Sequence, residues 1–168
     1  RIPDAEGVLR EAEPTRWAVT RFEYDAASQL VRRINPDGTE EKTVYDSCGR
    51  VIRVVSGTRV AAYEYDRCGR ITSVQDTTYG RRTFAYDAAG QIVRVTDGLG
   101  YRTHFSYTEN GQVAQVMDAT GQVTAYEYDA MDRVTRVTRG TGTSHAIVEE
   151  YAYDAAGRTP RYFHGLQD

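Results

Sequence analysis

The chain has 168 residues, of which 40% are hydrophobic and 27% are charged, which is an ordinary composition for a soluble domain. Its formal net charge of −3 gives no electrostatic case for nucleic-acid binding, and no apolar run approaches the roughly 20 residues of a membrane helix. Thirteen Tyr and 15 Gly stand against one Trp and 4 Pro, and this bias favours strands joined by tight turns.

The N-terminal segment has the pattern of a turn followed by the start of a strand. Residues 4–9 provide this pattern, and Asp4 lies 21 residues before Asp25. We expect residues 1–16 to be a degenerate partial copy of the unit that fills the rest of the chain. No charged segment followed by an apolar one marks a signal peptide here. Because the chain opens inside a partial copy and shows no capping element, we expect it to be a fragment of a longer array.

From residue 17 onward a Tyr-Asp signature recurs at a nearly fixed interval. The tyrosines of the first to seventh repeats are Tyr24, Tyr45, Tyr65, Tyr86, Tyr107, Tyr128 and Tyr153, at steps of 21, 20, 21, 21, 21 and 25 residues. The acidic partners are Asp25, Asp46, Asp66, Asp87, Asp129 and Asp154, and glycine follows three residues later as Gly49, Gly69, Gly90, Gly111 and Gly157. Thr108 replaces the fifth Asp, and Ser28 and Asp132 replace glycine in the first and sixth repeats. Such a period predicts a single repeat array over residues 1–168, with about seven full units.

The fourth repeat illustrates the unit. Residues 83–86 alternate as a first strand, with Phe84 and Tyr86 on one face. Residues 87–90 form a turn, in which the Asp accepts from downstream N–H groups and the glycine is left-handed. Residues 91–95 are a β-branched second strand, and residues 97–100 turn back toward the next repeat. Each unit is therefore predicted to be a β-hairpin of about 21 residues, and the units to join into one continuous curved antiparallel sheet, an all-β fold.

The apolar residues of each second strand do not fit a regular strand. Ile92 and Val95, like Val51 and Val54, lie three residues apart, which places them on opposite faces. Either both faces are partly covered or a bulge re-phases each second strand. We favour the bulge, because repeated bulges would also curve the sheet.

The last two repeats depart from the period. The step of 25 residues predicts a longer turn at residues 139–144, with a bend or partner contact as the alternative to a solvated loop. After Gly157, Thr159 and Pro160 replace the usual apolar pair. We expect the second strand to fail there, because proline cannot donate to a ladder.

No constellation of residues predicts catalysis, a cofactor or a metal site. One Asp per unit at the same turn position is what a turn requires, whereas calcium needs several oxygens converging on one ion. Cys48 and Cys68 occupy equivalent turn positions about 10 Å apart, too far for a disulfide, and we expect free thiols. His104, His145 and His164 are scattered, and His104 is expected on the surface, facing opposite to Phe105. We predict that the protein is not an enzyme.

Two other repeat classes fit part of the pattern. The aromatic rows are typical of a carbohydrate- or choline-binding hairpin module, but such modules depend on Trp pairs, and Trp17 stands alone. Two units would also make a β-propeller blade of about 42 residues, but blades alternate in kind and these units do not.

The unit Tyr86–Gly100 resembles the YD-repeat, or Rhs (rearrangement hotspot), family, whose pattern is Tyr-Asp-x-x-Gly-x-[Leu/Ile]-x-x-[Val/Ile]. The resemblance covers nearly the whole chain in seven registered copies. It implies a segment of a spiral β-shell, as in bacterial polymorphic toxins, the BC components of insecticidal toxin complexes, and teneurins. The Asp-Pro-x-Gly-x core motif that precedes self-cleavage in such toxins is not found, so no protease or toxin activity is expected of this chain.

The function implied by the resemblance is enclosure. The chain would be a shell segment of a secreted bacterial toxin that encapsulates a C-terminal effector and helps to deliver it. Its partners would be the remainder of the same shell protein, the enclosed toxin and components of a secretion machine, with no nucleic acid and no membrane span. The protein would be secreted or delivered by a bacterial secretion system. The alternative is a carbohydrate- or cell-surface-binding adhesion module of the teneurin kind.

Overall fold

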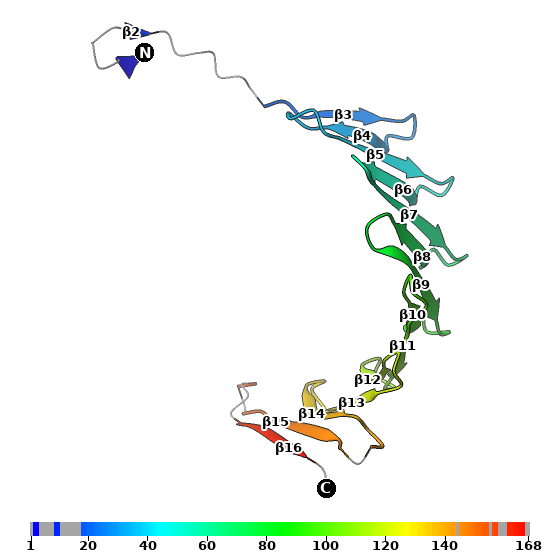
Figure 1. Ribbon diagram of the computed structural model, residues 1–168, viewed down its shortest axis with the longest axis vertical. Coiled ribbons are helices and arrows are strands. Elements are labelled where there is room, and N and C mark those ends of the chain that lie inside the picture. Colours follow the sequence, from blue (N-terminus) through cyan, green and yellow to red (C-terminus); the bar gives the residue numbers. More distant parts are fainter. Residues whose placement is uncertain are drawn as a thin grey trace. The chain divides into compact units, whose positions relative to one another are not determined.

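The computed structural model describes residues 2–3, 9–10, 18–143, 145–154, 156–157 and 161–166, with side chains for 18–143, 145–154 and 156–157. The chain divides into two compact units, Arg1–Ala61 and Ala62–Asp168. All regular structure in the described residues is β-strand (Figure 1). The predicted all-β class is confirmed.

The strands of each unit follow one another in chain order. The first unit contains β1 (Ile2–Pro3), β2 (Leu9–Arg10), β3 (Arg21–Tyr24), β4 (Leu30–Ile34), β5 (Glu40–Tyr45) and β6 (Val51–Ser56). Strand β7 (Arg59–Tyr65) begins in the first unit and ends in the second. The second unit continues with β8 (Ile71–Asp76), β9 (Gly80–Tyr86), β10 (Ile92–Thr96), β11 (Arg102–Tyr107), β12 (Val113–Met117), β13 (Val123–Tyr128), β14 (Val134–Arg139), β15 (Ile147–Ala152) and β16 (Arg161–Leu166).

Antiparallel pairing joins each hairpin to the next as well as the two strands within it. In the first unit β3, β4, β5 and β6 pair in that order, and β1 pairs with β2. In the second unit the pairing runs without interruption from β8 to β16. The tandem hairpins predicted from the period are therefore present.

A bulge re-phases the second strand in five repeats, as the spacing of the apolar residues predicts. Tyr86 pairs with Ile92 but the preceding Ala85 pairs with Arg94, so Val93 is an extra residue with no partner. The same shift occurs between β3 and β4, β5 and β6, β11 and β12, and β13 and β14. One extra residue reverses the alternation of faces. The two apolar residues of a second strand therefore lie on the same face.

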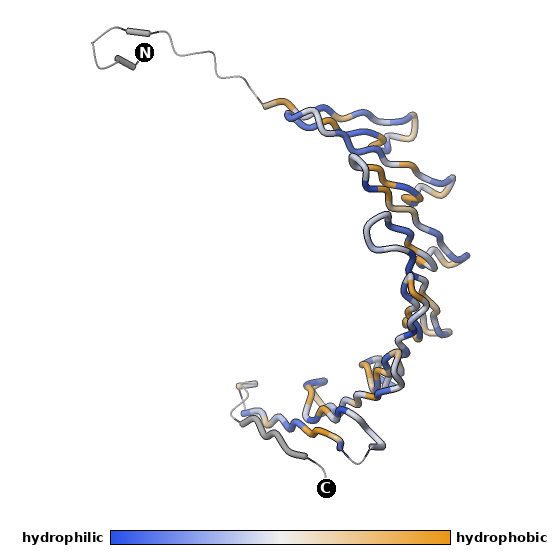
Figure 2. Tube along the Cα trace, viewed as in Figure 1, coloured by the Kyte–Doolittle hydropathy of each residue, from blue (hydrophilic) through white to orange (hydrophobic). Residues whose placement is uncertain are grey.

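The bulges give every sheet segment one aromatic and one polar face. We define the aromatic face as the side that carries the Tyr-Asp tyrosines; Phe84 also lies there, directly opposite Val95. The other side, the polar face, carries Ala85, Arg94 and His104. His104 thus faces away from Phe105, as predicted. Figure 2 shows hydrophobic and hydrophilic residues alternating along the strands.

The sheet is a single layer with little closed core. Within the part of the chain whose side chains are described, the buried hydrophobic residues are Val137, Ala146 and Val148. They lie around the long turn of the sixth repeat. Strand β14 ends at Arg139 and β15 begins at Ile147, so this turn lies where the 25-residue step predicts it. The N–H groups of Gly140 and Thr141 donate to the Val123 carbonyl, at 2.9 and 3.1 Å.

The prediction that the last second strand fails is wrong. Strand β16 pairs with β15, with Ala152 opposite Arg161 and Tyr151 opposite Tyr162. Counted from Tyr153, Arg161 takes the position of Arg94 in the fourth repeat. The described strand begins at Arg161, after the proline, so its ladder does not need an N–H from that residue.

The N-terminal copy is described only in part. Pro3 pairs with Leu9, the same offset of six residues that joins Tyr86 to Ile92. The turn expected at residues 4–8 lies outside the described residues.

Candidate functional site: the junction between repeats

The Asp of each signature organises the first turn of its hairpin. In the second repeat, Asp46 Oδ1 accepts from the N–H groups of Cys48 and Arg50, both at 2.9 Å. The same carboxylate-to-backbone bonding occurs at Asp25, Asp66, Asp87, Asp129 and Asp154. In the fifth repeat Thr108 replaces the carboxylate, and its hydroxyl oxygen accepts from the Gln112 N–H at 3.1 Å. Asp and Thr are thus used as turn formers.

The residue three positions after each Asp is left-handed. The glycines of the signature, Gly49, Gly69, Gly90, Gly111 and Gly157, have φ between 76° and 86°. Ser28 and Asp132, which replace glycine, adopt φ 62° in the same place. The turn geometry therefore persists where the sequence departs from the signature, at the steric cost of a side chain in this region.

The residue after this left-handed position ties the turn to its Asp. Arg50 Nε donates to Asp46 Oδ2 at 2.7 Å, and Arg133 Nε donates to Asp129 Oδ2 at 2.8 Å. The Arg50 backbone N–H, followed by its guanidinium, lowers the pKa of Asp46; at Asp129 the Arg133 guanidinium comes first and its backbone N–H second. These carboxylates therefore stay ionised at neutral pH.

The tyrosine of each signature reaches back to the preceding repeat. Tyr86 Oη donates to the Ile71 carbonyl at 2.7 Å, and Tyr107 Oη donates to the Ile92 carbonyl at 2.7 Å. The same bond joins Tyr45 to Leu30 at 3.0 Å, Tyr128 to Val113 at 2.8 Å and Tyr153 to Val134 at 2.6 Å. In the bulges with a known register, the acceptor is the residue just before the extra one. We call this contact the tyrosine clasp.

Arginine side chains from the turn complete the junction. The guanidinium of Arg70 lies 4.6 Å from the ring centre of Tyr86, and that of Arg133 lies 4.4 Å from the ring centre of Tyr153. Arg70 Nη1 also donates to the Asp87 carbonyl at 3.3 Å. These junctions thus combine a hydroxyl bond with a cation over the same ring. Because these contacts link adjacent repeats only, stability accrues repeat by repeat.

The clasp is the functional feature that the sequence pattern did not predict. The predicted site residues fall into two groups. The Asp and Gly of a signature form one turn of their own hairpin, whereas the Tyr bonds to the preceding repeat. The signal was present in the sequence. The position two residues before each signature Tyr accepts Phe22, Phe84 and Phe105, but the signature position itself always keeps its hydroxyl.

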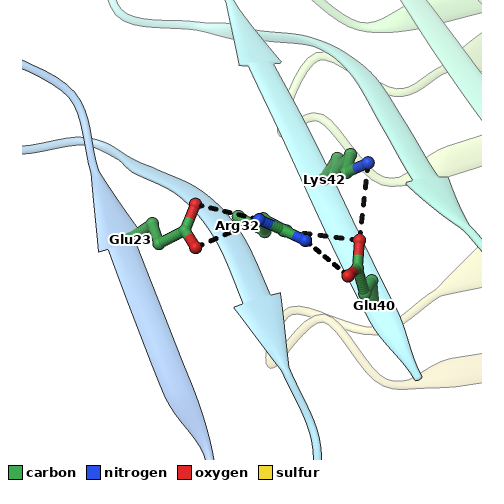
Figure 3. A network of polar contacts seen from close by, with 4 residues as sticks. All are labelled: Glu23, Arg32, Glu40 and Lys42. Atoms are coloured by element: carbon green, nitrogen blue, oxygen red, sulfur yellow. Dashed lines mark hydrogen bonds and ion pairs between the residues drawn. The ribbon is translucent and has the colours of Figure 1, made fainter. Parts of the chain in front are cut away.

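The polar face carries ion pairs across neighbouring strands. Figure 3 shows Arg32 between Glu23 and Glu40, with Lys42 beside Glu40. The Glu40 side chain, followed by Glu23, raises the pKa of Arg32. In the second unit the equivalent arginine, Arg136, lies 3.8 Å from a Glu127 oxygen and 3.6 Å from a Glu150 oxygen. Exposed pairs of this kind contribute little stability, and they make this face suited to water.

One carboxylate is buried on the aromatic face of the last hairpin. Glu149 accepts from the Arg139 guanidinium, and from the Tyr151 hydroxyl at 3.0 Å. The side chain of Glu149 is only 11% exposed. Its two donors satisfy the buried charge, so this group is a structural pair.

The described side chains offer no assembled catalytic or metal-binding group. No cluster of three or more potential metal ligands occurs among them. Cys48 and Cys68 are free thiols and are exposed. In the same part of the chain no helix is long and apolar enough to cross a membrane.

Comparison with known proteins adds a family and a fold. The family model described as RHS Repeat matches residues 86–116 and 107–144. No curated protein matches the sequence. The structure is similar to chains of the crystal structure of TcdB2-TccC3-Cdc42 (TM-score 0.73, 13% identity, 89% of this chain and 9% of that chain). It is also similar to TcdB2-TccC3 without its hypervariable C-terminal region (TM-score 0.63, 14% identity, 89% and 11%) and to the Photorhabdus luminescens Tc holotoxin pore (TM-score 0.52, 14% identity, 84% and 11%).

The fold and the junction define an all-β protein of tandem hairpin repeats, in which five signature tyrosines bond to the preceding repeat. The family match identifies the repeats within residues 86–144 as Rhs, or YD, repeats, and the structural likeness to Tc toxin components is consistent with that family's fold. At 13–14% identity the structural likeness is one of fold, and the chain spans about a tenth of the length of the chains that it matches.

Proposed function

We propose that this array is a wall segment of a secreted bacterial Rhs toxin, and that the wall encloses a C-terminal effector until it is delivered. The whole chain, residues 1–168, would be one array of about seven repeats with a degenerate copy at residues 1–16. It would act by enclosure, without catalysis. Its partners would be the rest of the same shell, the effector and the delivery machinery.

The observation that carries this proposal is the clasp between adjacent repeats. A globular domain closes a core, but here the described side chains leave the sheet almost without buried hydrophobic residues. The bonds that hold one repeat to the next recur at each step, so repeats can be added without a limit set by a central core. A wall requires this property. The likeness to Tc toxin components supports the same conclusion at the level of fold.

Protease protection of the full-length protein tests the proposal. The gene product that contains this array is digested under native conditions, and fragments C-terminal to the array are followed by mass spectrometry. Enclosure predicts that those fragments persist until the array unfolds. A variant in which Tyr86, Tyr107 and Tyr128 are all replaced by Phe should release them at lower denaturant concentration. Immediate cleavage of the downstream segment in the native protein would contradict enclosure.

The adhesion alternative has its own measurement. Purified array is titrated with glycans and with choline, and saturable binding at millimolar concentration or below would favour a carbohydrate- or cell-surface-binding module. The wall proposal expects no such binding.

A further inference from the structure

Several arginines of the polar face are neutralised by a carboxylate. Arg32 bonds to Glu23 and Glu40, and Arg136 lies between Glu127 and Glu150. In the third and fourth repeats Arg81 bonds to Glu64 at 3.0 Å. The fourth and fifth repeats contain an exception to this pairing.

Arg94 and Arg102 are exposed and have no ion-pair partner among the residues whose side chains are described. Arg94 occupies the same repeat position as Arg32 and Arg136, but the residue opposite it is Ala85, where those arginines face a glutamate. The pairing of Arg94 with His104, and of Thr96 with Arg102, places both guanidiniums on the polar face as diagonal neighbours. Diagonal neighbours in an antiparallel pair lie roughly 7–8 Å apart.

A hollow adjoins these arginines. Its lining includes Tyr101, Arg102, His104, Met117 and Asp118. Asp118, the one carboxylate among the lining residues described, already accepts from the N–H groups of Thr120 and Gln122, both at 2.9 Å. The hollow therefore combines an unneutralised guanidinium with an exposed thioether and an aromatic ring.

The second repeat contains the same hollow with a different charge balance. There Glu40 and Lys42 take the positions of Arg102 and His104, and Val55 takes that of Met117. Glu40 is bonded to Arg32 and to Lys42, so that hollow neutralises itself. In the hollow of the fifth repeat no described carboxylate bonds to Arg102, because Asp118 is held by the N–H groups of its own turn.

Apolar side chains gather at the rim of the same edge. Tyr79, Leu99 and Tyr101 are 65%, 83% and 59% exposed. They stand on two consecutive turns that touch, because a Cβ on Gly98 would meet the Arg81 backbone nitrogen at 3.2 Å. Exposed apolar groups beside unpaired charges are typical of an interaction surface.

We propose that Arg94, Arg102 and the adjoining hollow bind an extended acidic segment of polypeptide. Alternate carboxylates along an extended chain are roughly 6.6–7 Å apart, which matches the diagonal spacing of the two guanidiniums. The residue between them points away from the sheet, and the next residue on the binding side, two positions beyond a carboxylate, would place an apolar side chain toward Met117. Guanidinium groups suit carboxylates because they bind both oxygens in one plane. A nucleic acid would require a broader basic footprint than two arginines on a chain of net charge −3.

Fluorescence anisotropy tests this site on the intact chain. The probe is a short fluorescein-labelled peptide in which two glutamates and then a leucine occupy alternate positions, with serine between them. Binding to the wild-type chain should weaken by about tenfold or more in the double variant Arg94→Gln, Arg102→Gln. The matched control is Arg82→Gln, which removes an exposed arginine that lies opposite Val74 on the aromatic face, and its affinity should change less than about twofold.

Two further measurements make the outcome decisive. Met117→Glu places a carboxylate in the hollow and should abolish binding while both arginines remain. A peptide of the same composition with its glutamates grouped together should bind several-fold more weakly. The proposal is overturned if the peptide does not bind, or if Arg82→Gln weakens its binding as much as the double variant does. It is also overturned if the arginines bind a membrane instead, so that anionic vesicles bind the wild type but not the double variant, and the peptide binds neither. Circular dichroism of each variant establishes that it is folded.

Discussion

Removing one hydroxyl from the clasp should destabilise the array more than removing the hydroxyl of a neighbouring tyrosine. Strand β13 provides both in the same environment. Tyr128 Oη donates to the Val113 carbonyl at 2.8 Å. Tyr126 lies on the same face two residues earlier, and its hydroxyl makes no hydrogen bond with the residues described. Tyr128→Phe and Tyr126→Phe therefore both remove a phenolic oxygen, but only Tyr128→Phe also removes a hydrogen bond.

The expected magnitude follows from that bond alone, because phenylalanine retains the ring and its contacts. An intramolecular hydrogen bond contributes about 0.5–1.5 kcal/mol net, and an acceptor left half-buried without a partner adds a further cost. We expect Tyr128→Phe to lower the free energy of unfolding by about 1–2 kcal/mol. Tyr126→Phe should change it by less than about 0.5 kcal/mol, as an ordinary surface substitution does.

Urea unfolding followed by far-ultraviolet circular dichroism provides the measurement. The two variants and the wild type are compared at the same protein concentration, and the midpoint shift is converted with the common slope. Equal midpoints for Tyr128→Phe and Tyr126→Phe would refute the role of the clasp. Clasps two strands apart share no partner, so replacing Tyr86, Tyr107 and Tyr128 together should lower stability by nearly the sum of the single effects.

Three other predictions follow from the turns and the sheet edge. Gly121→Ala should destabilise the array by about 1 kcal/mol, because Gly121 has φ 85° and the space around it is open, so only the backbone strain is added. Asp132→Gly should stabilise it by up to about 1 kcal/mol, because it removes a side chain from a residue with φ 62°. Thermal unfolding measures both changes. The pKa of Asp129 is lowered in the folded state, chiefly by Arg133, so the stability that its carboxylate contributes is complete above the unfolded pKa of about 4 and is lost as pH falls further. In urea unfolding measured from pH 7 to 3, Asp129→Asn should therefore lose less stability than the wild type, and the control Glu109→Gln should lose as much as the wild type. Strand β3, exposed along its whole length, should pair with another chain, and sedimentation should show concentration-dependent oligomers of the isolated array; a clean monomer would count against this.

The sequence predicts the hairpin unit well because its information is local and repeated seven times. The period sets the number of hairpins, and the Asp-to-glycine turn sets where each one reverses. The three-residue spacing of Ile92 and Val95 predicts the bulge, since both residues reach one buried face only if an extra residue stands between them. The prediction for β16 was wrong because a proline next to a strand was taken to prevent the whole strand. The ladder of β16 begins one residue later, at Arg161, where every residue has an N–H to donate.

The junction lies beyond what single-repeat patterns reveal. Tyr107 and Ile92 belong to different repeats and are 15 residues apart, so no hairpin rule connects them. The lack of an ion pair at Arg94 cannot be predicted from the repeat pattern either, because it depends on which residue the bulged register places opposite this arginine. Both features depend on cross-strand neighbours, which the sequence specifies only after the register is known.

The seventh repeat separates the contact that builds the wall from the spacing that first revealed it. Its tyrosine lies 25 residues after the sixth instead of 21, yet Tyr153 still donates to Val134, 19 residues back. The four additional residues are taken up by the turn between β14 and β15, on the polypeptide path but outside the clasp. A regular period is therefore not required for the array to continue. The clasp requires only that the tyrosine hydroxyl reaches the carbonyl of the residue just before the bulge. Lengthening the turn between two hairpins should therefore be tolerated, whereas shifting a bulge by one residue should break the junction.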